Sequence, residues 1–117
     1  MKSEPTFTAT IWVGVKEHYA PTPPADWHER ACAVLQEYVD AVGLCVTFTP
    51  TEFLYTKGNE PGFCVGLINY PRFPSSPEVV KSHAIELARR LLLEFKQFKV
   101  SVVFPDETIM VEESDYV

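Results

Sequence analysis

The loop 69–76 concentrates side chains that suit the binding of a small anion. It runs from a predicted strand into a predicted helix, and helix N-termini present unpaired amides and a partial positive charge. Its arginine and serines would donate hydrogen bonds, its two aromatic rings would stack on a flat ring, and its asparagine would read that ring's edge. The predicted ligand-binding residues are Asn69, Tyr70, Arg72, Phe73, Ser75 and Ser76. The alternative is a stiff loop that packs on itself, with Arg72 paired to a surface acid such as Glu60.

A second polar stretch, 49–60, combines threonine hydroxyls with the carboxylates of Glu52 and Glu60. Carboxylates beside threonines suit hydrogen bonds to sugar hydroxyls, and a buried carboxylate would serve as a general base. The alternative is a solvated edge strand that resists aggregation.

The residue pattern gives little support to a metal site, a catalytic nucleophile or a known nucleotide-binding motif. His28 and Cys32 share one helical face, but zinc needs at least three protein ligands and no further Cys or His lies nearby in sequence. His18 and His83 are expected to be solvated surface histidines. The sequence contains no GxSxG, GxxxxGK[ST] or GxGxxG motif. We therefore predict no catalytic residues, no metal and no cofactor, and we favour a protein that is not an enzyme.

The elements that must position these residues follow from hydrophobic periodicity, which alternates between two and about 3.6 residues along the chain. Asp26 and Glu29 have capping-box spacing, and Ser76 followed by Pro77 indicates a second helix start. Pro50 favours an edge strand, whereas the apolar run 63–70 favours an interior strand. The predicted elements are strand 6–15, helix 26–42, strands 44–55 and 63–70, helix 76–95, and strands 98–104 and 108–111.

This order predicts an α+β fold of ferredoxin-like type, β-α-β-β-α-β with a short C-terminal β extension. An antiparallel sheet would carry both helices on one face, within a single domain 1–117 whose acidic tail 112–117 frays. The other face would expose Thr8, Thr10 and Trp12, which we predict as the interface of a homodimer or higher homo-oligomer.

Composition narrows the partners and the compartment. The net charge of −6 argues against a nucleic-acid backbone as partner. Of the three cysteines, Cys32, Cys45 and Cys64, two lie in segments predicted as buried strand, which indicates a reducing compartment. No apolar run is long enough for a membrane span or a signal peptide. We expect a cytoplasmic protein with no membrane partner.

Three segments carry a resemblance. Trp12–Lys16 comes first, Glu60–Gly62 then leads into Val65–Pro74, and Gln97 precedes a Val-Ser-Val-Val strand. This pattern resembles small uncharacterised proteins of bacteria and their phages, of ferredoxin-like type. The resemblance implies a stand-alone small protein and carries no activity.

Together these observations favour non-enzymatic binding of a small anionic, nucleotide-like ligand by a homo-oligomer. By analogy, a phage protein that sequesters a host signalling nucleotide fits this description. One alternative is a protein-protein interaction module that uses the sheet face around Trp12 or the edge strand. A second alternative is a small enzyme with a carboxylate general base.

Overall fold

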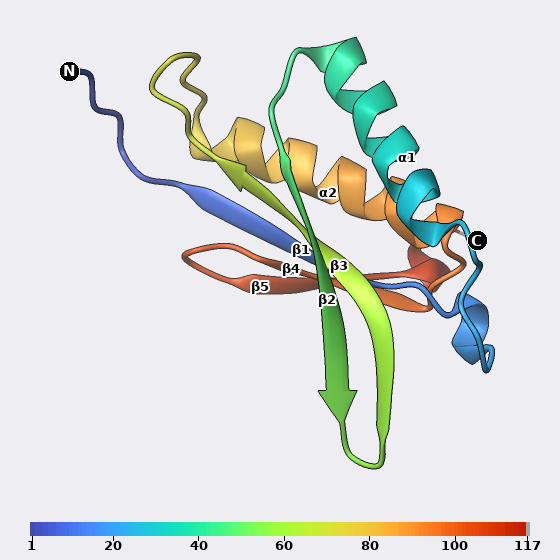
Figure 1. Ribbon diagram of the computed structural model, residues 1–117. Coiled ribbons are helices and arrows are strands. Elements are labelled where there is room, and N and C mark those ends of the chain that lie inside the picture. Colours follow the sequence, from blue (N-terminus) through green and yellow to red (C-terminus); the bar gives the residue numbers. More distant parts are fainter. Residues whose placement is uncertain (117) are drawn as a thin grey trace.

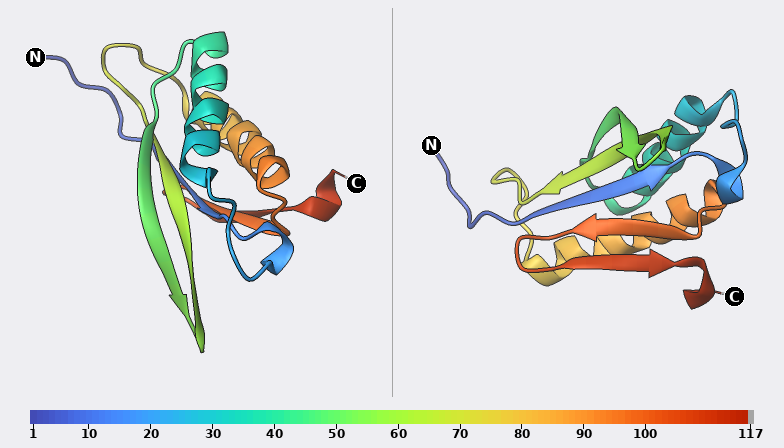
Figure 2. Two further views of the ribbon diagram at one scale, coloured as in Figure 1. Left: turned by 45° about the vertical axis from the view of Figure 1, so that its right-hand side comes forward. Right: turned by 90° about the horizontal axis from the view of Figure 1, so that it is seen from below.

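A five-stranded antiparallel sheet carries two helices on one face (Figures 1 and 2). The computed structural model describes residues 1–116. The strand order is β2-β3-β1-β4-β5, so the predicted ferredoxin-like α+β arrangement is confirmed, with β2 at an edge and β3 inside the sheet. The elements are β1 (Thr8–Gly14), a 3-10 turn (Glu17–Tyr19), α1 (Trp27–Val42), β2 (Thr47–Tyr55), β3 (Gly58–Ile68), α2 (Pro77–Glu94), β4 (Lys99–Val103), β5 (Thr108–Glu112) and a second 3-10 turn (Glu113–Asp115).

The helix ends agree in part with the predicted caps. Ser76 Oγ accepts a hydrogen bond from the Val79 amide at 3.3 Å, as a capping serine should. Gly43 ends α1 in the left-handed region at φ 71°, where the absence of a Cβ avoids a steric clash. The capping box at Asp26 was wrong: its side chain makes no cap hydrogen bond, and its carboxylate lies 3.8 Å from the Arg30 guanidinium instead.

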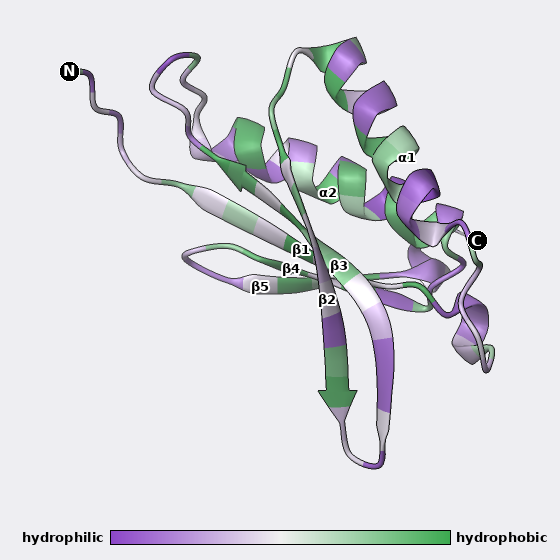
Figure 3. Ribbon diagram, viewed as in Figure 1, coloured by the Kyte–Doolittle hydropathy of each residue, from purple (hydrophilic) through white to green (hydrophobic). Residues whose placement is uncertain are grey.

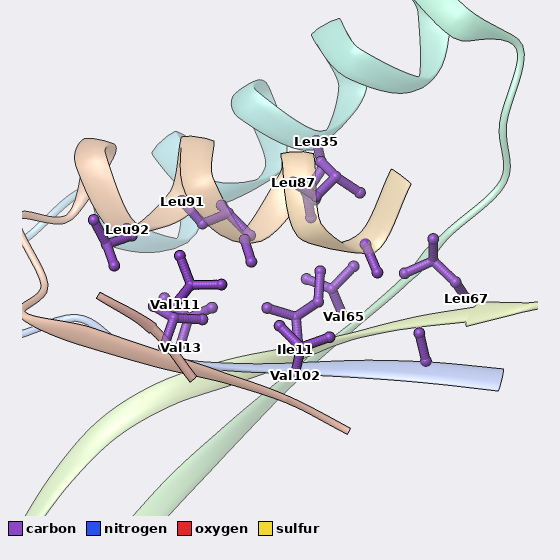
Figure 4. Close-up of a cluster of buried hydrophobic side chains, with 14 of the residues drawn as sticks. Ile11, Val13, Leu35, Val65, Leu67, Leu87, Leu91, Leu92, Val102 and Val111 are labelled. Carbon is purple, nitrogen blue, oxygen red and sulfur yellow. The ribbon is translucent and has the colours of Figure 1, made fainter. Parts of the chain in front are cut away.

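The core lies between the sheet and the helices. Inward residues of β1 such as Ile11 and Val13 are fully buried, as are Leu87 and Leu91 of α2 above them (Figure 4). Phe63 of β3 is also fully buried, and its ring packs against three other rings. Their centroids lie 5.1 to 6.1 Å away and belong to Trp27, Phe48 and Phe95. This aromatic cluster ties both helices to the edge half of the sheet.

The sheet face opposite the helices is uncovered, and the β2–β3 hairpin extends past the ends of the helices (Figures 1 and 3). Register places Trp12 between Cys64 of β3 and Ser101 of β4 on this face. Cys64 is therefore half-buried on the open face, and Cys45 is exposed before β2 begins. The prediction that two of the cysteines lie in buried strand segments holds in part: Cys64 lies in the interior strand β3 but points away from the core, whereas Cys45 precedes β2.

The acidic C-terminal segment folds back on the sheet as far as the structure describes it. Glu112 ends β5, and the Glu113 amide donates to the Phe98 carbonyl at 2.9 Å. The sequence predicts fraying over 112–117. In the structure Glu113–Asp115 form the second 3-10 turn, the Tyr116 amide donates to the Glu113 carbonyl at 3.0 Å, and Val117 lies outside the described residues. No helix within residues 1–116 combines the length and apolar character that crossing a membrane requires.

Glu86 on α2 gives the fold a specific pH dependence. Hydrogen bonds from Arg89 and then Arg90 lower the pKa of the Glu86 carboxyl from 4.5 to about 2. A carboxyl whose pKa is lower in the folded state contributes stability above its unfolded pKa and loses it as the pH falls toward the folded value. We therefore expect the stability gap between wild type and Glu86→Gln to be present at neutral pH and to close near pH 2. Urea unfolding at both pH values measures the gap, and a gap independent of pH would contradict this role.

Candidate functional site

In the loop 69–76, which the sequence predicts to bind a ligand, the asparagine side chain hydrogen-bonds to the protein backbone. Asn69 Nδ2 donates to the Pro5 carbonyl at 2.9 Å, and Asn69 Oδ1 accepts from the Ser75 amide at 2.8 Å. The side chain therefore ties the N-terminal segment to the loop. With both of its ends in use, Asn69 has little left for reading a ligand.

Tyr70, Phe73 and Ser76 of this loop also contact one another or the helix start. The rings of Tyr70 and Phe73 lie 5.1 Å apart, and Ser76 caps α2. Arg72 is exposed. A depression of about 330 Å³ lies beside Ser75 and Ser76. These contacts match the self-packing alternative, and ligand binding by the loop stays a prediction.

A second depression lies on the open sheet face and is lined by polar, charged and aromatic side chains. Its volume is about 230 Å³, and it lies where β1, β3 and β4 meet the chain entering β4. We call it the sheet-face pocket. It is lined by Trp12, Gly14, Tyr19, Phe53, Glu60, Gln97, Phe98, Lys99 and Ser101.

Two acceptor oxygens converge on the floor of this pocket. The buried Gln97 side chain donates from Nε2 to the carbonyls of Lys16 and Phe95, both at 2.9 Å, which fixes its amide. A Cβ built on Gly14 would lie 3.0 Å from Gln97 Oε1 and 3.1 Å from Glu60 Oε2. The space above Gly14 is thus flanked by an amide oxygen and a carboxylate oxygen, an environment that favours a cation or a hydrogen-bond donor.

Aromatic rings form the walls of the sheet-face pocket. Trp12 and Phe53 meet edge to face with centroids 6.3 Å apart, and Tyr19 lies 5.1 Å from Phe98. Aromatic faces attract both cations and flat heterocycles. Lys99 adds one positive charge at the rim. The pocket therefore combines groups for a cation, an anion and a planar ring.

The predicted interface residues divide between the pocket and its surroundings. Trp12 lines the pocket and is 38% exposed. Thr10 and Thr8 lie farther along β1 on the same open face, paired with Gly66 and Ile68 of β3. Their part in a homo-oligomer interface stays a prediction.

One wall of the pocket rests on a strained turn. His18 and Tyr19 have φ values of 43° and 61°, in the left-handed region that costs a non-glycine residue about 1–2 kcal/mol. The His18 ring stacks on Phe98 at 4.4 Å, and His18 Nε2 lies 2.8 Å from Glu113 Oε2. His18 is exposed, as predicted for a surface histidine, and its ring also lies between Phe98 and the Glu113 carboxylate.

The other histidines and cysteines do not form a metal centre. His28 Nδ1 lies 4.0 Å from Cys32 Sγ, which is a weak contact, and His83 hydrogen-bonds the Tyr38 hydroxyl at 2.7 Å. Within residues 1–116, no group of three or more His, Cys, Asp or Glu side chains is placed to hold a metal ion.

Larger depressions elsewhere offer less chemistry. One of about 440 Å³ between the helices is lined by Arg89 and Arg90, whose guanidiniums already pair with Glu86. Another of about 280 Å³ between α1 and β2 is mostly apolar, with Cys32 and Cys45 at its edges. We therefore take the sheet-face pocket as the candidate site.

The comparisons with known proteins identify the fold. No protein family matches the sequence, and no curated protein matches it either. Among solved structures, the chain is similar to a phage SAM (S-adenosylmethionine) lyase in complex with S-methyl-5'-thioadenosine, with a TM-score of 0.73 and 19% identity over 100% of this chain and 97% of that one. It is also similar to a phage SAM lyase in the apo state, with a TM-score of 0.65 and 20% identity over 95% and 92% of the two chains.

These likenesses correct the functional prediction. The chain shares a fold over its whole length with an enzyme, so the predicted non-enzymatic ligand binder and the preference against an enzyme are contradicted. Of the alternatives drawn from the sequence, the small enzyme with a carboxylate base is the better supported. The resemblance to phage proteins is confirmed at the level of fold.

Sequence reasoning found one part of the sheet-face pocket and missed the rest. It marked Glu60 as a candidate hydrogen-bond acceptor or general base, and Trp12 as an exposed ring of the predicted interface. It did not connect them with Gln97, because residues 14, 60 and 97 meet only through strand pairing and a buried side chain. Gln97 comes just before the alternating residues of β4, and nothing in the neighbouring sequence indicates that its side chain is buried.

Proposed function

We propose that this protein cleaves S-adenosylmethionine in the sheet-face pocket and releases S-methyl-5'-thioadenosine. The observation that supports the proposal most is the fold likeness, over the whole chain, to a phage SAM lyase that holds this product. The substrate is a nucleoside, so the nucleotide-like ligand expected from the sequence becomes the substrate of an enzyme.

The chemistry of the pocket suits this substrate. S-adenosylmethionine carries a sulfonium, an ammonium, a carboxylate and an adenine. Glu60 and the oxygen of Gln97 offer acceptors to a cationic group, Lys99 offers a cation to the carboxylate, and the aromatic walls suit the adenine. The net charge of −6 further favours approach of a molecule with net positive charge.

A lyase step breaks the bond between sulfur and the amino-acid carbon without water, and the bonding electrons remain on sulfur as a neutral thioether. Two electron sources balance the step. The substrate's own carboxylate forms a new C–O bond and closes a lactone, or the neighbouring C–H bond becomes a C=C bond while Glu60 accepts the proton. In the first route opposite charges neutralise each other, so aromatic walls, which stabilise separated charges less well than water does, would favour it.

The pocket covers only part of such a substrate. Its volume of about 230 Å³ is below the roughly 300–1,000 Å³ of typical small-molecule sites. A nucleoside seated here would extend over the open face of β1 and β3. A homo-oligomer that pairs this face, as the sequence predicts, would cover the remainder of the substrate.

Incubation of the purified protein with S-adenosylmethionine tests the proposal. We expect S-methyl-5'-thioadenosine to appear as the substrate disappears, in equal amounts by liquid chromatography and mass spectrometry. The co-product identifies the route: the lactone and the unsaturated amino acid are isomers of equal mass, but mild base opens the lactone and adds the mass of one water to it, whereas the unsaturated amino acid gains none. Release of S-adenosylhomocysteine with a methylated acceptor, or an intact substrate, would contradict the proposal.

A further inference from the structure

Tyr19 is a large aromatic side chain that the core does not use. It is 75% exposed, yet it lies in the lining of the sheet-face pocket and against Phe98 at a centroid distance of 5.1 Å. Exposure this high means that most of the ring surface is free to take a second contact. An exposed ring at the rim of a pocket is well suited to stack on a flat heterocycle.

The other aromatic wall is less available. Trp12 and Phe53 contact each other edge to face with an interplanar angle of 70°, and Trp12 is only 38% exposed. Both rings also lie close to Glu60, because β3, the strand of Glu60, pairs with β1 and with β2. They are therefore better placed beside the charged part of a substrate than around its purine ring.

Tyr19 is held in place by a turn with a strained backbone. Both His18 and Tyr19 occupy the left-handed region, and three contacts keep the turn there. The His18 amide donates to the Lys96 carbonyl at 2.9 Å, its ring stacks on Phe98 at 4.4 Å, and its Nε2 lies 2.8 Å from Glu113 Oε2. Glu113 is itself anchored, because its amide donates to the Phe98 carbonyl at 2.9 Å. Strained backbone that the surrounding contacts enforce commonly marks a functional position.

We propose that Tyr19, held against Phe98 by the His18–Glu113 contact, stacks on the adenine of the nucleoside bound in the sheet-face pocket. This inference rests on the proposed function and adds a specificity residue to it. Tyr19 touches the ring of the substrate. His18 and Glu113 are positioning residues that act through Tyr19.

The test compares Tyr19→Ala with Tyr19→Phe and with Tyr55→Ala. Tyr55 is the control, a tyrosine that is 53% exposed at the end of β2 and does not line the sheet-face pocket. Loss of one stacked base contact should weaken binding of S-methyl-5'-thioadenosine to Tyr19→Ala about 5- to 150-fold by calorimetry. Tyr19→Phe keeps the ring and should bind as the wild type does, as should Tyr55→Ala.

Glu113→Gln tests the positioning role. We expect faster amide hydrogen exchange at residues 17–20 and a higher KM for S-adenosylmethionine with an unchanged kcat, because the ring is misplaced while the charged part of the pocket is intact. Unchanged exchange would overturn the role of Glu113. Normal cleavage with unaltered KM in Tyr19→Ala would overturn this inference alone, whereas a wild-type protein that neither binds the product nor cleaves the substrate would overturn the proposed function as well.

Discussion

Replacing Glu60 with glutamine is expected to slow cleavage of S-adenosylmethionine by about 100- to 1,000-fold, the loss typical of removing one preorganised electrostatic group from an active site. The glutamine keeps the shape of the side chain but removes the charge beside Gln97 and Gly14. Both routes of cleavage depend on that charge, either to hold the sulfonium end or to accept a proton. Steady-state product formation measured by mass spectrometry checks the prediction.

The hairpin supplies a matched control in Glu52→Gln. Glu52 precedes Phe53 on β2, so it points to the opposite face of the hairpin, where its carboxylate accepts a hydrogen bond from Asn59 at 2.8 Å. This variant should cleave the substrate at the wild-type rate. Equal losses in both variants would indicate a general effect of hairpin charge, and a fully active Glu60→Gln would remove Glu60 from the site.

Truncation of Phe63 to alanine should destabilise the protein by about 3–5 kcal/mol, the usual cost of emptying a buried phenylalanine site. The ring is fully buried and meets Trp27, Phe48 and Phe95, so no solvent-facing side chain can fill the space. Since the free energy of unfolding of small domains is only about 5–15 kcal/mol, this change would remove a large part of it. Chemical denaturation measures it.

Phe73→Ala serves as the comparison for stability. Phe73 is 42% exposed, and its removal from the loop should change the free energy of unfolding by no more than about 0.5–1 kcal/mol. If Phe63→Ala proved equally mild, the aromatic cluster would not be the link between the helices and the edge half of the sheet.

The fold was largely predictable because its signals are local. The alternation in β1 and the helical stripe of α2 each follow from side-chain burial on one face. Pro50 marked an edge strand, and the structure places β2 at the edge. The N-terminus of α1 was harder, because Asp26 has capping spacing but its carboxylate lies near Arg30 instead.

The candidate site was predictable only in fragments. The loop 69–76 attracted attention because polar and aromatic residues are adjacent in sequence, yet Asn69 uses both its ends on backbone groups. The sheet-face pocket joins residues that lie far apart in sequence, and β1, β3 and the segment before β4 bring them together. Local composition therefore pointed to the loop and not to the pocket, since adjacency in sequence reports nothing about long-range pairing.

A crystal structure of the protein grown with S-methyl-5'-thioadenosine tests the central claim most directly, because it locates the nucleoside without reference to rates. The account predicts the thioether sulfur beside Glu60 and Trp12, with the adenine against Tyr19. Nucleoside bound instead at the loop 69–76, or in the groove between α1 and β2, would contradict it.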